Sequence, residues 1–312
     1  MIVGNSLELS RAVSKLPGGG EILLEDGYYR LKRFSAGPES GHLTIKPAPG
    51  ARPVLQSLDL NKCRNMLFEG IRFRNGEDGK GGASLLRCDN VTLLDCNCKG
   101  GAIGYVGRGD PVPGSFVMVR SSNNCHILGC DIFKYWHAAS FLDCTGCSFM
   151  LNRVWNMAGD GLRMAGVQDM RADGNTFRAF YGSAQDRNHT DMVQIFTAPF
   201  LDLDTKRVSI IGNTLDCRGG RATQSIFILN ERFGATGVPF EDLRIEGNNI
   251  RNGHVHGVHV ANAIRSRIIG NTLQWDREAF IRYPKGDENS QPIIRILGVR
   301  DGLVEAGNRM AD

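Results

Sequence analysis

The sequence lacks long apolar runs and a strong imbalance of charge. No stretch of about 18 apolar residues occurs, so no membrane-spanning helix is expected. The first residues, MIVGNSLELS, contain neither a basic segment nor a long apolar one, so we predict no signal peptide in this chain. Lys and Arg total 37 against 33 Asp and Glu, and a formal net charge of +4 does not indicate a nucleic-acid-binding protein.

Cysteine is present without the pairing of a zinc site. The nine Cys residues are an odd number, and six of them form close pairs with unmatched spacings: Cys96 and Cys98, Cys125 and Cys130, Cys144 and Cys147. Zinc sites repeat one short spacing, so we predict no metal site at these pairs. We expect buried thiols that act as small apolar side chains. Their number favours folding in a reducing compartment.

Long helical patterns are few, whereas the 39 Gly residues predict many turns. One helix is expected near the N-terminus, where four apolar residues recur at helical spacing: Leu9, Ala12, Val13 and Leu16. Asn5 or Ser6 is its expected N-cap. The run PGGG at 17–20 ends it, and short strands follow at 21–24 and 28–31 around an Asp-Gly turn.

A short pattern then recurs along the chain. Alternating apolar residues lead into a bend, often Gly-Asn, and alternating apolar residues follow, as in RVSIIGNTL (207–215) and SRIIGNTL (266–273). The residues after the bends are Ile71, Cys96, Cys130, Asn152, Asn175, Asn213, Asn248, Asn271 and Asn308. Cys130 to Asn152 is 22 residues and Asn152 to Asn175 is 23, so the basic unit is 22–23 residues with loops inserted in some copies. Such a unit buries its apolar side only by stacking on its neighbours, and the Asn residues are expected to stack into a ladder.

The N-terminal helix, the segment PGGGEILLEDGYY and eight or nine such coils resemble the pectin-lyase-like superfamily. The resemblance implies an all-β fold, a single-stranded right-handed parallel β-helix with an N-terminal capping helix. We predict one domain over residues 1–312, with residues 1–20 as the cap and 21–312 as coils. The superfamily includes lyases, hydrolases, epimerases and phage tailspikes, so the resemblance is more specific for fold than for activity.

A second series of strands precedes the bends: 137–142, 160–165, 191–196, 224–229 and 256–261. Alternation turns one set of residues outward, namely Ser140, Arg163, Gln194, Phe227 and His259. The residues that open the strands form a neighbouring polar column: His137, Asp160, Asp191, Gln224 and His256. Asp160 and Asp191 also share the parity of inward residues, so a place in a turn is the competing interpretation for both. Exposed charge is the competing interpretation for Arg163.

Long insertions are predicted at 100–115, 179–190, 197–206, 230–241 and 275–291, and we expect them to wall the same face. They contain aromatic and Arg residues, including Tyr181, Arg187 and Arg232, which suit an extended acidic sugar chain. We predict catalytic roles for His189, Arg163, Asp191 and Tyr181. We predict substrate binding by Arg187, Gln194, Asp160, His256, His259, Arg232 and His137.

The favoured function is a polysaccharide lyase that cleaves a uronate-containing polymer by β-elimination. Arg163 or Arg187 would neutralise the carboxylate, His189 would remove the C5 proton, and Tyr181 or His259 would protonate the leaving oxygen. Asp191 would orient His189. Several superfamily lyases neutralise the carboxylate with calcium, for which this sequence offers only Asp202 and Asp204 as a close acidic pair. No other cofactor is predicted.

Two alternatives stay open. A glycoside hydrolase would use Asp160 and Asp191, which open adjacent strands about 5–7 Å apart. The superfamily's polygalacturonases carry Asn-Thr-Asp, Asp-Asp, Gly-His-Gly and Arg-Ile-Lys, where this chain has His189-Thr190-Asp191, Gln224-Ser225, His256-Gly257 and Arg267-Ile268-Ile269. The other alternative is a non-catalytic carbohydrate-binding β-helix. The expected partner is an acidic polysaccharide, and a monomer or a tailspike-like homotrimer is the expected assembly. The location stays open between secretion after loss of a signal and a phage virion.

Overall fold

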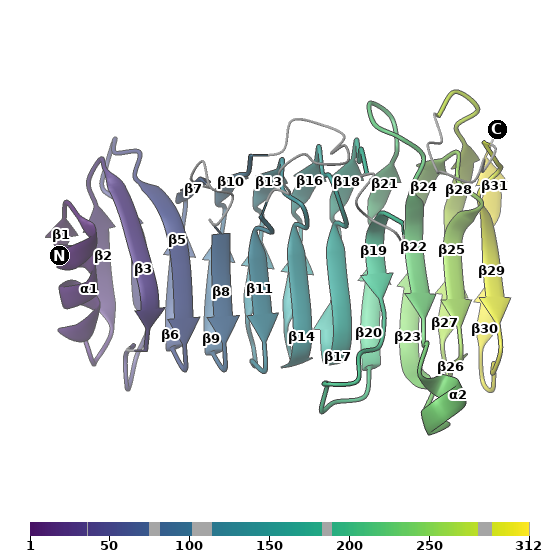
Figure 1. Cartoon of the computed structure of the whole chain (residues 1–312), viewed down its shortest axis with the longest axis horizontal. Helices are drawn as coiled ribbons and strands as arrows, with labels where there is room; N and C mark the ends of the chain where they lie inside the picture. The colour runs from purple at the N-terminus through teal and green to yellow at the C-terminus, as the bar shows by residue number, and fades with distance from the viewer. Residues whose placement is uncertain (36, 75–81, 102–113, 183–188, 280–288, 312) are drawn as a thin grey trace.

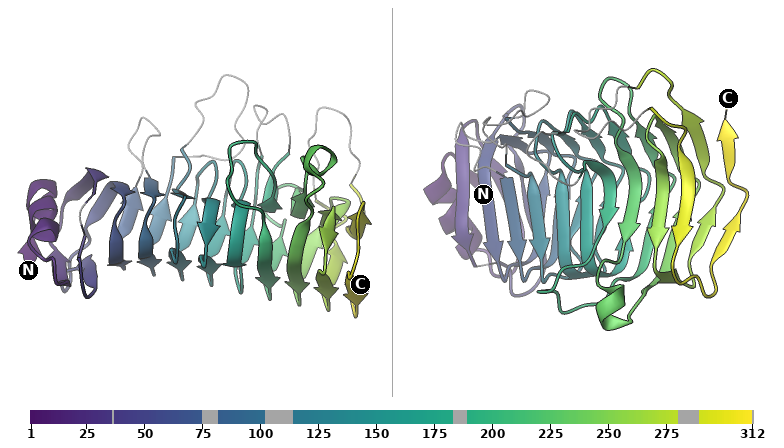
Figure 2. Two further views of the ribbon diagram at one scale, coloured as in Figure 1. Left: turned by 90° about the horizontal axis from the view of Figure 1, so that it is seen from below. Right: turned by 45° about the vertical axis from the view of Figure 1, so that its right-hand side comes forward.

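Each coil of the chain contributes short parallel strands to three columns that run the length of the molecule (Figures 1 and 2). The computed structural model describes residues 1–35, 37–74, 82–101, 114–182, 189–279 and 289–311. Within these ranges it contains 31 strands and two short helices. The chain is a right-handed parallel β-helix, as predicted, because a unit of this length satisfies its backbone hydrogen bonds only through the coils on either side.

The N-terminal end is covered by helix α1, Ser6–Ser14. The Asn5 side chain accepts a hydrogen bond from the Glu8 backbone N–H at 3.0 Å, which confirms Asn5 as the N-cap. Leu9, Ala12 and Val13 are buried against the first coils, so this helix shields an otherwise open end of the core (Figure 1).

The first column carries the predicted site strands. Its members, in order of pairing, are β3 (Tyr28–Phe34), β5 (Val54–Asn61), β8 (Gly82–Leu86), β11 (Val117–Arg120), β14 (Ala139–Thr145), β17 (Leu162–Arg171), β19 (Asp191–Ile195), β22 (Gln224–Leu229), β25 (His256–Ala261) and β29 (Ile293–Leu297).

The second column follows the first in each coil, and the long strand β17 belongs to both. Its other members are β1 (Ile2–Val3), β2 (Gly20–Leu24), β4 (Leu43–Pro47), β6 (Arg64–Glu69), β9 (Asp89–Leu94), β12 (His126–Leu128), β15 (Ser148–Met150), β20 (Lys206–Ile211), β23 (Phe240–Glu246), β26 (Ala263–Ile264), β27 (Arg267–Ile269) and β30 (Val304–Ala306).

The third column closes each coil. It consists of β7 (Arg72–Arg74), β10 (Asn97–Lys99), β13 (Asp131–Phe133), β16 (Arg153–Trp155), β18 (Thr176–Arg178), β21 (Thr214–Asp216), β24 (Asn249–Asn252), β28 (Thr272–Trp275) and β31 (Arg309–Ala311). In most coils the bend between the second and third columns contains a Gly with positive φ, for example Gly212 at 64°, a conformation that a side chain disfavours; Asp95 and Leu151 adopt it in two coils.

The Asn residues after these bends form the predicted ladder. Each side-chain oxygen accepts from the backbone N–H of the preceding Asn, as from Asn213 to Asn248 at 2.9 Å. The series runs through Asn152, Asn175, Asn213, Asn248, Asn271 and Asn308. All but the half-buried Asn308 are buried, and a buried backbone N–H requires a hydrogen-bond acceptor, so the ladder holds consecutive coils in register.

The core lies inside the three columns. The residues predicted to point inward from β17, β19, β22 and β25 are at most 1% exposed: Leu162, Met164, Val193, Ile195, Ile226, Ile228, Val258 and Val260. All nine cysteines are buried free thiols, as predicted.

The predicted insertions do not all border one edge of the first column. Segments 100–115, 179–190 and 275–291 precede β11, β19 and β29, whereas 197–206 and 230–241 follow β19 and β22. Figure 1 shows the connection from β19 to β20, and helix α2 (Phe233–Thr236), at the lower edge, where the strands of the first column end. Residues 102–113, 183–188 and 280–288 of these segments lie outside the described residues. A strand of five residues spans about 16 Å, so 197–206 and 230–241 border the end of the strands opposite to His189. The expectation of a single wall is therefore wrong.

Candidate functional site

The outward residues of the first column align as the sequence predicted. Strand pairing places Ser140 beside Arg163, Arg163 beside Gln194, Gln194 beside Phe227 and Phe227 beside His259. A row of polar and aromatic side chains therefore crosses five coils on one face. The parallel register puts neighbours about 4.8 Å apart, close enough for each side chain to contact the next.

Asp160 and Asp191 connect the opening positions of two neighbouring coils. The backbone N–H of Asp191 donates to Asp160 Oδ1 at 2.9 Å, and the other oxygen of Asp160 lies 3.2 Å from Arg163 Nε. Asp160 is 4% exposed and Asp191 is fully buried. Both carboxylates therefore lie beneath the surface, where they hold other groups.

His137 and Arg163 present two hydrogen-bond donors side by side. The Asp160 backbone N–H donates to His137 Nδ1 at 2.9 Å, so this nitrogen carries no proton and Nε2 carries the hydrogen of the neutral ring. Burial, with the nearby charge of Arg163, lowers the pKa of His137 to about 3. His137 Nε2 lies 3.4 Å from Arg163 Nη1, and two donors do not bond each other. An anionic oxygen between them would accept from both.

Arg163 is held in place from three sides. Its Nε lies 3.3 Å from Gln194 Oε1 and 3.2 Å from Asp160 Oδ2, and its guanidinium carbon lies 4.8 Å from the centre of the Phe196 ring. The side chain is 30% exposed, so the remaining N–H groups reach solvent. A guanidinium fixed in this way loses little conformational freedom when it binds a carboxylate.

His189 stands over the buried Asp191. His189 Nδ1 lies 3.1 Å from Asp191 Oδ1, which makes Nδ1–H the donor and leaves the lone pair on Nε2. The side chain of His189 is 24% exposed. A carboxylate beneath an imidazole stabilises the protonated ring, so this pair has the arrangement of a general base with its orienting group.

Aromatic rings surround His189 on the side of the following coils. Its ring centre lies 4.9 Å from that of Phe227, and Phe227 stacks on His259 at 4.6 Å. His256 lies 4.8 Å from His259 and 5.2 Å from His254. Burial and neighbouring positive charge lower the pKa of both His254 and His259 to about 4. These rings are neutral near pH 7, so His259 is a poor general acid there.

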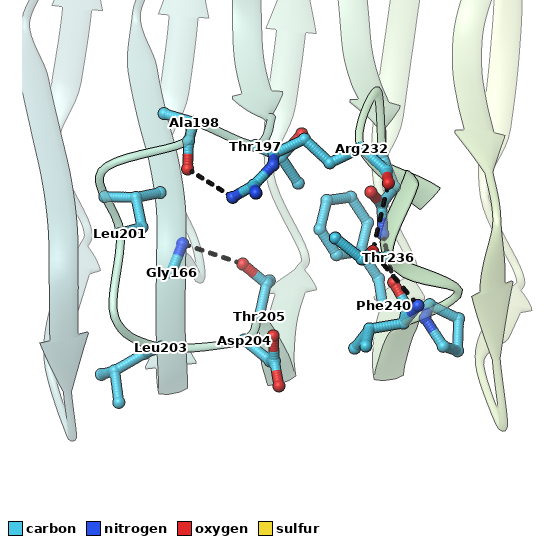
Figure 3. A pocket seen from close by; sticks show the side chains of 13 residues that line it. Gly166, Thr197, Ala198, Leu201, Leu203, Asp204, Thr205, Arg232, Thr236 and Phe240 are labelled. Carbon is cyan, nitrogen blue, oxygen red and sulfur yellow. Dashed lines mark hydrogen bonds between the residues drawn. The ribbon is translucent and has the colours of Figure 1, made fainter. Parts of the chain in front are cut away.

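Other predicted site residues lie elsewhere. Arg232 lines a cavity of about 60 Å³ beside α2, with its Nη1 donating to the Ala198 carbonyl at 3.3 Å (Figure 3). This cavity follows the C-terminal ends of β19 and β22, at the opposite end from His189, and has room for a few water molecules. Tyr181 lies half-buried three residues after the end of β18, its backbone N–H bonded to the Met157 carbonyl. Arg187 lies outside the described residues.

Three members of this surface were not predicted as site residues. The Phe227 ring contacts both His189 and His259. The strand alternation in the sequence had already predicted that Phe227 points outward, which could have identified it as a member of the site. Trp136 packs edge-on against His137 at 5.8 Å between ring centres. Gln224 pairs with Asp191 in the strand register and is 4% exposed. Its place as the first residue of a strand, like that of Asp191, could have identified it from the sequence.

Metal-ligand side chains do not gather in the part of the chain that the structure describes: no three His, Cys, Asp or Glu residues form a metal-binding group there. Asp202 and Asp204, the expected calcium candidates, lie on the segment after β19, away from His189. No helix among the described residues is long and apolar enough to cross a membrane.

Comparisons with known proteins identify the fold. No protein-family model and no curated protein matches the chain. Among solved structures, it is similar to the Dettilon tailspike protein (gp208), with a TM-score of 0.62 and 12% identity over 97% of this chain and 62% of that one. It is also similar to a PL6 alginate lyase solved with a trisaccharide, with a TM-score of 0.53 and 12% identity over 99% of this chain and 85% of that one. The chain has the parallel β-helix fold of these structures, and identities this low show nothing further.

Proposed function

We propose that this protein cleaves a uronate-containing polysaccharide by β-elimination on the outer face of the first column. The observation that carries the proposal is the donor pair of His137 Nε2 and Arg163 Nη1, 3.4 Å apart. A uronate carboxylate bridging these two groups would be bound by charge-assisted hydrogen bonds. Abstraction of the C5 proton places negative charge on that carboxylate, which the same fixed donors stabilise.

His189 is the proposed base. Its Nε2 accepts the C5 proton, and Asp191 stabilises the imidazolium that forms. The C5–H electrons form the C4–C5 double bond, the C4–O bond breaks, and the leaving oxygen takes a proton. Asp160 connects the two halves of the site, since it holds Arg163 through one oxygen and the Asp191 backbone through the other.

Tyr181 is the proposed acid for the leaving oxygen. Of the two candidates predicted from the sequence, His259 is neutral near pH 7, with a pKa of about 4. Tyr181 carries an O–H, and its backbone N–H is bonded to the Met157 carbonyl, three residues before Asp160 in sequence. Neutralisation of the carboxylate is assigned to Arg163, whose guanidinium is held by Asp160 and Gln194 and is 30% exposed.

The hydrolase alternative is weakened by burial. A hydrolase brings both carboxyl groups into contact with the scissile bond. Asp191 is fully buried beneath His189, and Asp160 is 4% exposed and engaged with Arg163. Both acids therefore serve to position other groups. Binding without cleavage requires the donor pair alone, and is the second candidate function.

The test is the ultraviolet absorbance of an unsaturated uronate product, followed over a panel of alginate, polygalacturonate and glycosaminoglycans. Activity is expected on at least one polymer. It should be lost in His189→Ala and in Arg163→Lys, because lysine keeps the positive charge but lacks the Nη1 donor that lies beside His137 Nε2. Arg171→Ala on the second-column part of the same strand is the matched control. New reducing ends without absorbance would establish hydrolysis, and binding without either signal would establish a carbohydrate-binding protein.

Assembly is a separate expectation. A monomer and a homotrimer are the two assemblies expected for this chain, and light scattering during gel filtration distinguishes them. EDTA treatment tests calcium: activity that is unchanged supports Arg163 as the neutralising group, and activity restored only by calcium contradicts it.

A further inference from the structure

The third column carries an aromatic pair on its outer face, away from the first-column site. Phe133 and Trp155 occupy neighbouring coils, and their rings stack with centres 4.4 Å apart at an angle of 13°. The indole N–H of Trp155 donates to Asp131 Oδ1 at 2.8 Å, which fixes the ring orientation. The half-buried Trp155 is therefore a rigid platform with one face covered by Phe133.

A groove of about 420 Å³ opens on the other side of Trp155. Its lining comes mainly from the following coils and includes three Arg residues: Arg153, Arg178 and Arg218. Strand pairing puts Arg178 directly beside Trp155, and its Nε donates to the Arg218 carbonyl at 3.3 Å. Arg178 is exposed, and within the described residues no carboxylate lies at salt-bridge distance from it. Arg218 is paired with Asp216, and Arg153 lies 4.0 Å from Asp131.

We propose that this groove is a second carbohydrate-binding surface that holds one acidic sugar unit. The flat indole would pack against the C–H face of a pyranose ring, while the Arg178 guanidinium would bind its carboxylate or sulfate. The volume accommodates a sugar ring, and the aromatic face with a neighbouring guanidinium is the chemistry that distinguishes an acidic sugar from a neutral one.

The alternation of charge on this surface favours a sugar over a nucleic acid. Asp131 and Asp216 lie in the same row of coils as Arg153 and Arg178, in strands that pair directly. A nucleic-acid strand carries a phosphate at every nucleotide and is bound by continuous basic surface. Acidic side chains between the Arg residues would repel such a backbone, whereas one uronate unit requires only one cation beside the platform.

This surface shares only its ligand class with the proposed function and does not depend on cleavage. Its test therefore uses the Arg163→Lys protein, in which the first-column site is disabled. Oligosaccharides of alginate and polygalacturonate are titrated while tryptophan fluorescence and heat of binding are recorded. Maltohexaose serves as the neutral probe and a thymidine oligonucleotide as the nucleic-acid probe.

The proposal expects an acidic oligosaccharide to bind with a change in tryptophan emission. Trp155→Ala should weaken binding about three- to tenfold, as for one lost ring contact, and Arg178→Gln by about tenfold. Trp275→Phe, at another position of the same column, is the matched control and should leave affinity unchanged. Arg178→Gln lies on the surface, so it tests the groove even if loss of Trp155 disturbs folding.

Equal affinity of Arg178→Gln and its parent for every acidic probe would overturn the proposal. Tighter binding of the oligonucleotide than of any acidic oligosaccharide would also overturn it, in favour of a nucleic-acid surface. Loss of cleavage in His189→Ala with intact groove binding would separate the two sites, so failure of either proposal is distinguishable from failure of the other.

Discussion

Removal of one rung of the Asn ladder should destabilise the whole solenoid. Asn213 is 1% exposed. Its Nδ2 donates to the Ala172 carbonyl at 2.8 Å and to Asn248 Oδ1 at 2.9 Å, and its Oδ1 accepts from the Asn175 backbone N–H at 2.8 Å and from Asn175 Nδ2 at 3.0 Å. Asn213→Ala deletes all four bonds in the interior of the coil stack.

The size of the effect follows from the groups left behind. Asn175 Nδ2 still donates to the Phe149 carbonyl, and Asn248 Oδ1 still accepts from the Asn213 backbone. The Asn175 backbone N–H and the Ala172 carbonyl lose a bond that the alanine does not replace, at about 1–3 kcal/mol for each buried group. The expected loss is therefore about 3 kcal/mol. An unfolding entropy of about 2.1 cal/mol/K per residue gives about 0.65 kcal/mol/K for this chain, so Tm should fall by about 5 °C.

Differential scanning calorimetry measures this shift, at one fixed scan rate for all variants. Asn249→Ala is the matched control, because Asn249 lies on the exposed face of the adjacent strand β24. Its expected shift is below about 1 °C, since surface substitutions change stability by about 0.5 kcal/mol or less. Equal shifts for the two variants would refute the view that side-chain hydrogen bonds hold consecutive coils together.

Three further predictions follow from individual sites. Three imidazoles whose pKa is lowered by burial, to about 3 for His137 and about 4 for His254 and His259, should make the protein acid-sensitive. Because their folded pKa values lie below the unfolded value near 6.5, the unfolded state binds more protons below that pH, so stability present above pH 6.5 is lost as pH falls. The loss is about 1.4 kcal/mol per pH unit for each ring, or about 4 kcal/mol in total at pH 5.5, and a Tm that is flat from pH 7 to 5.5 would contradict it. Gly161→Ala should lower Tm and activity, because an added Cβ would collide with the Met192 carbonyl oxygen, whereas Gly18→Ala, whose Cβ would meet no atom of the described residues within 4 Å, should leave thermal scans unchanged. Asp191→Asn should lower kcat about a hundredfold with little change in KM, since the neutral amide no longer stabilises protonated His189, and an unchanged kcat in initial-rate assays would remove Asp191 from the mechanism.

Repetition made much of the fold predictable. The bend after two apolar positions recurs whether or not loops intervene, so the position of Asn213 in one coil predicted that of Asn248 in the next, and the hydrogen bonds between them confirm it. Alternation likewise predicted the inward side chains of β19 and the outward row from Arg163 to His259, because a strand fixes the side of every residue once one is known.

The site was less predictable because it depends on contacts between coils. The alternation of inward and outward residues along the strand did not decide whether the Asp191 side chain lies in a turn or on the outer surface. The structure shows it fully buried yet in contact with His189, an arrangement that combines both interpretations. Arg232 was predicted to share a wall with the site, and it lies at the other end of the strands because its loop follows β22.

The sequence by itself determined the solenoid, its N-terminal cap and the face on which polar side chains align, since these follow from local periodicity repeated along the chain. Only the tertiary structure decided which polar groups meet. The donor pair of His137 and Arg163 joins residues 26 apart, and its chemistry depends on the Asp160 backbone N–H, which donates to His137 Nδ1 and thereby places the ring proton on Nε2. Such a pairing is set by the stacking of coils and the burial around it, which no single stretch of sequence encodes.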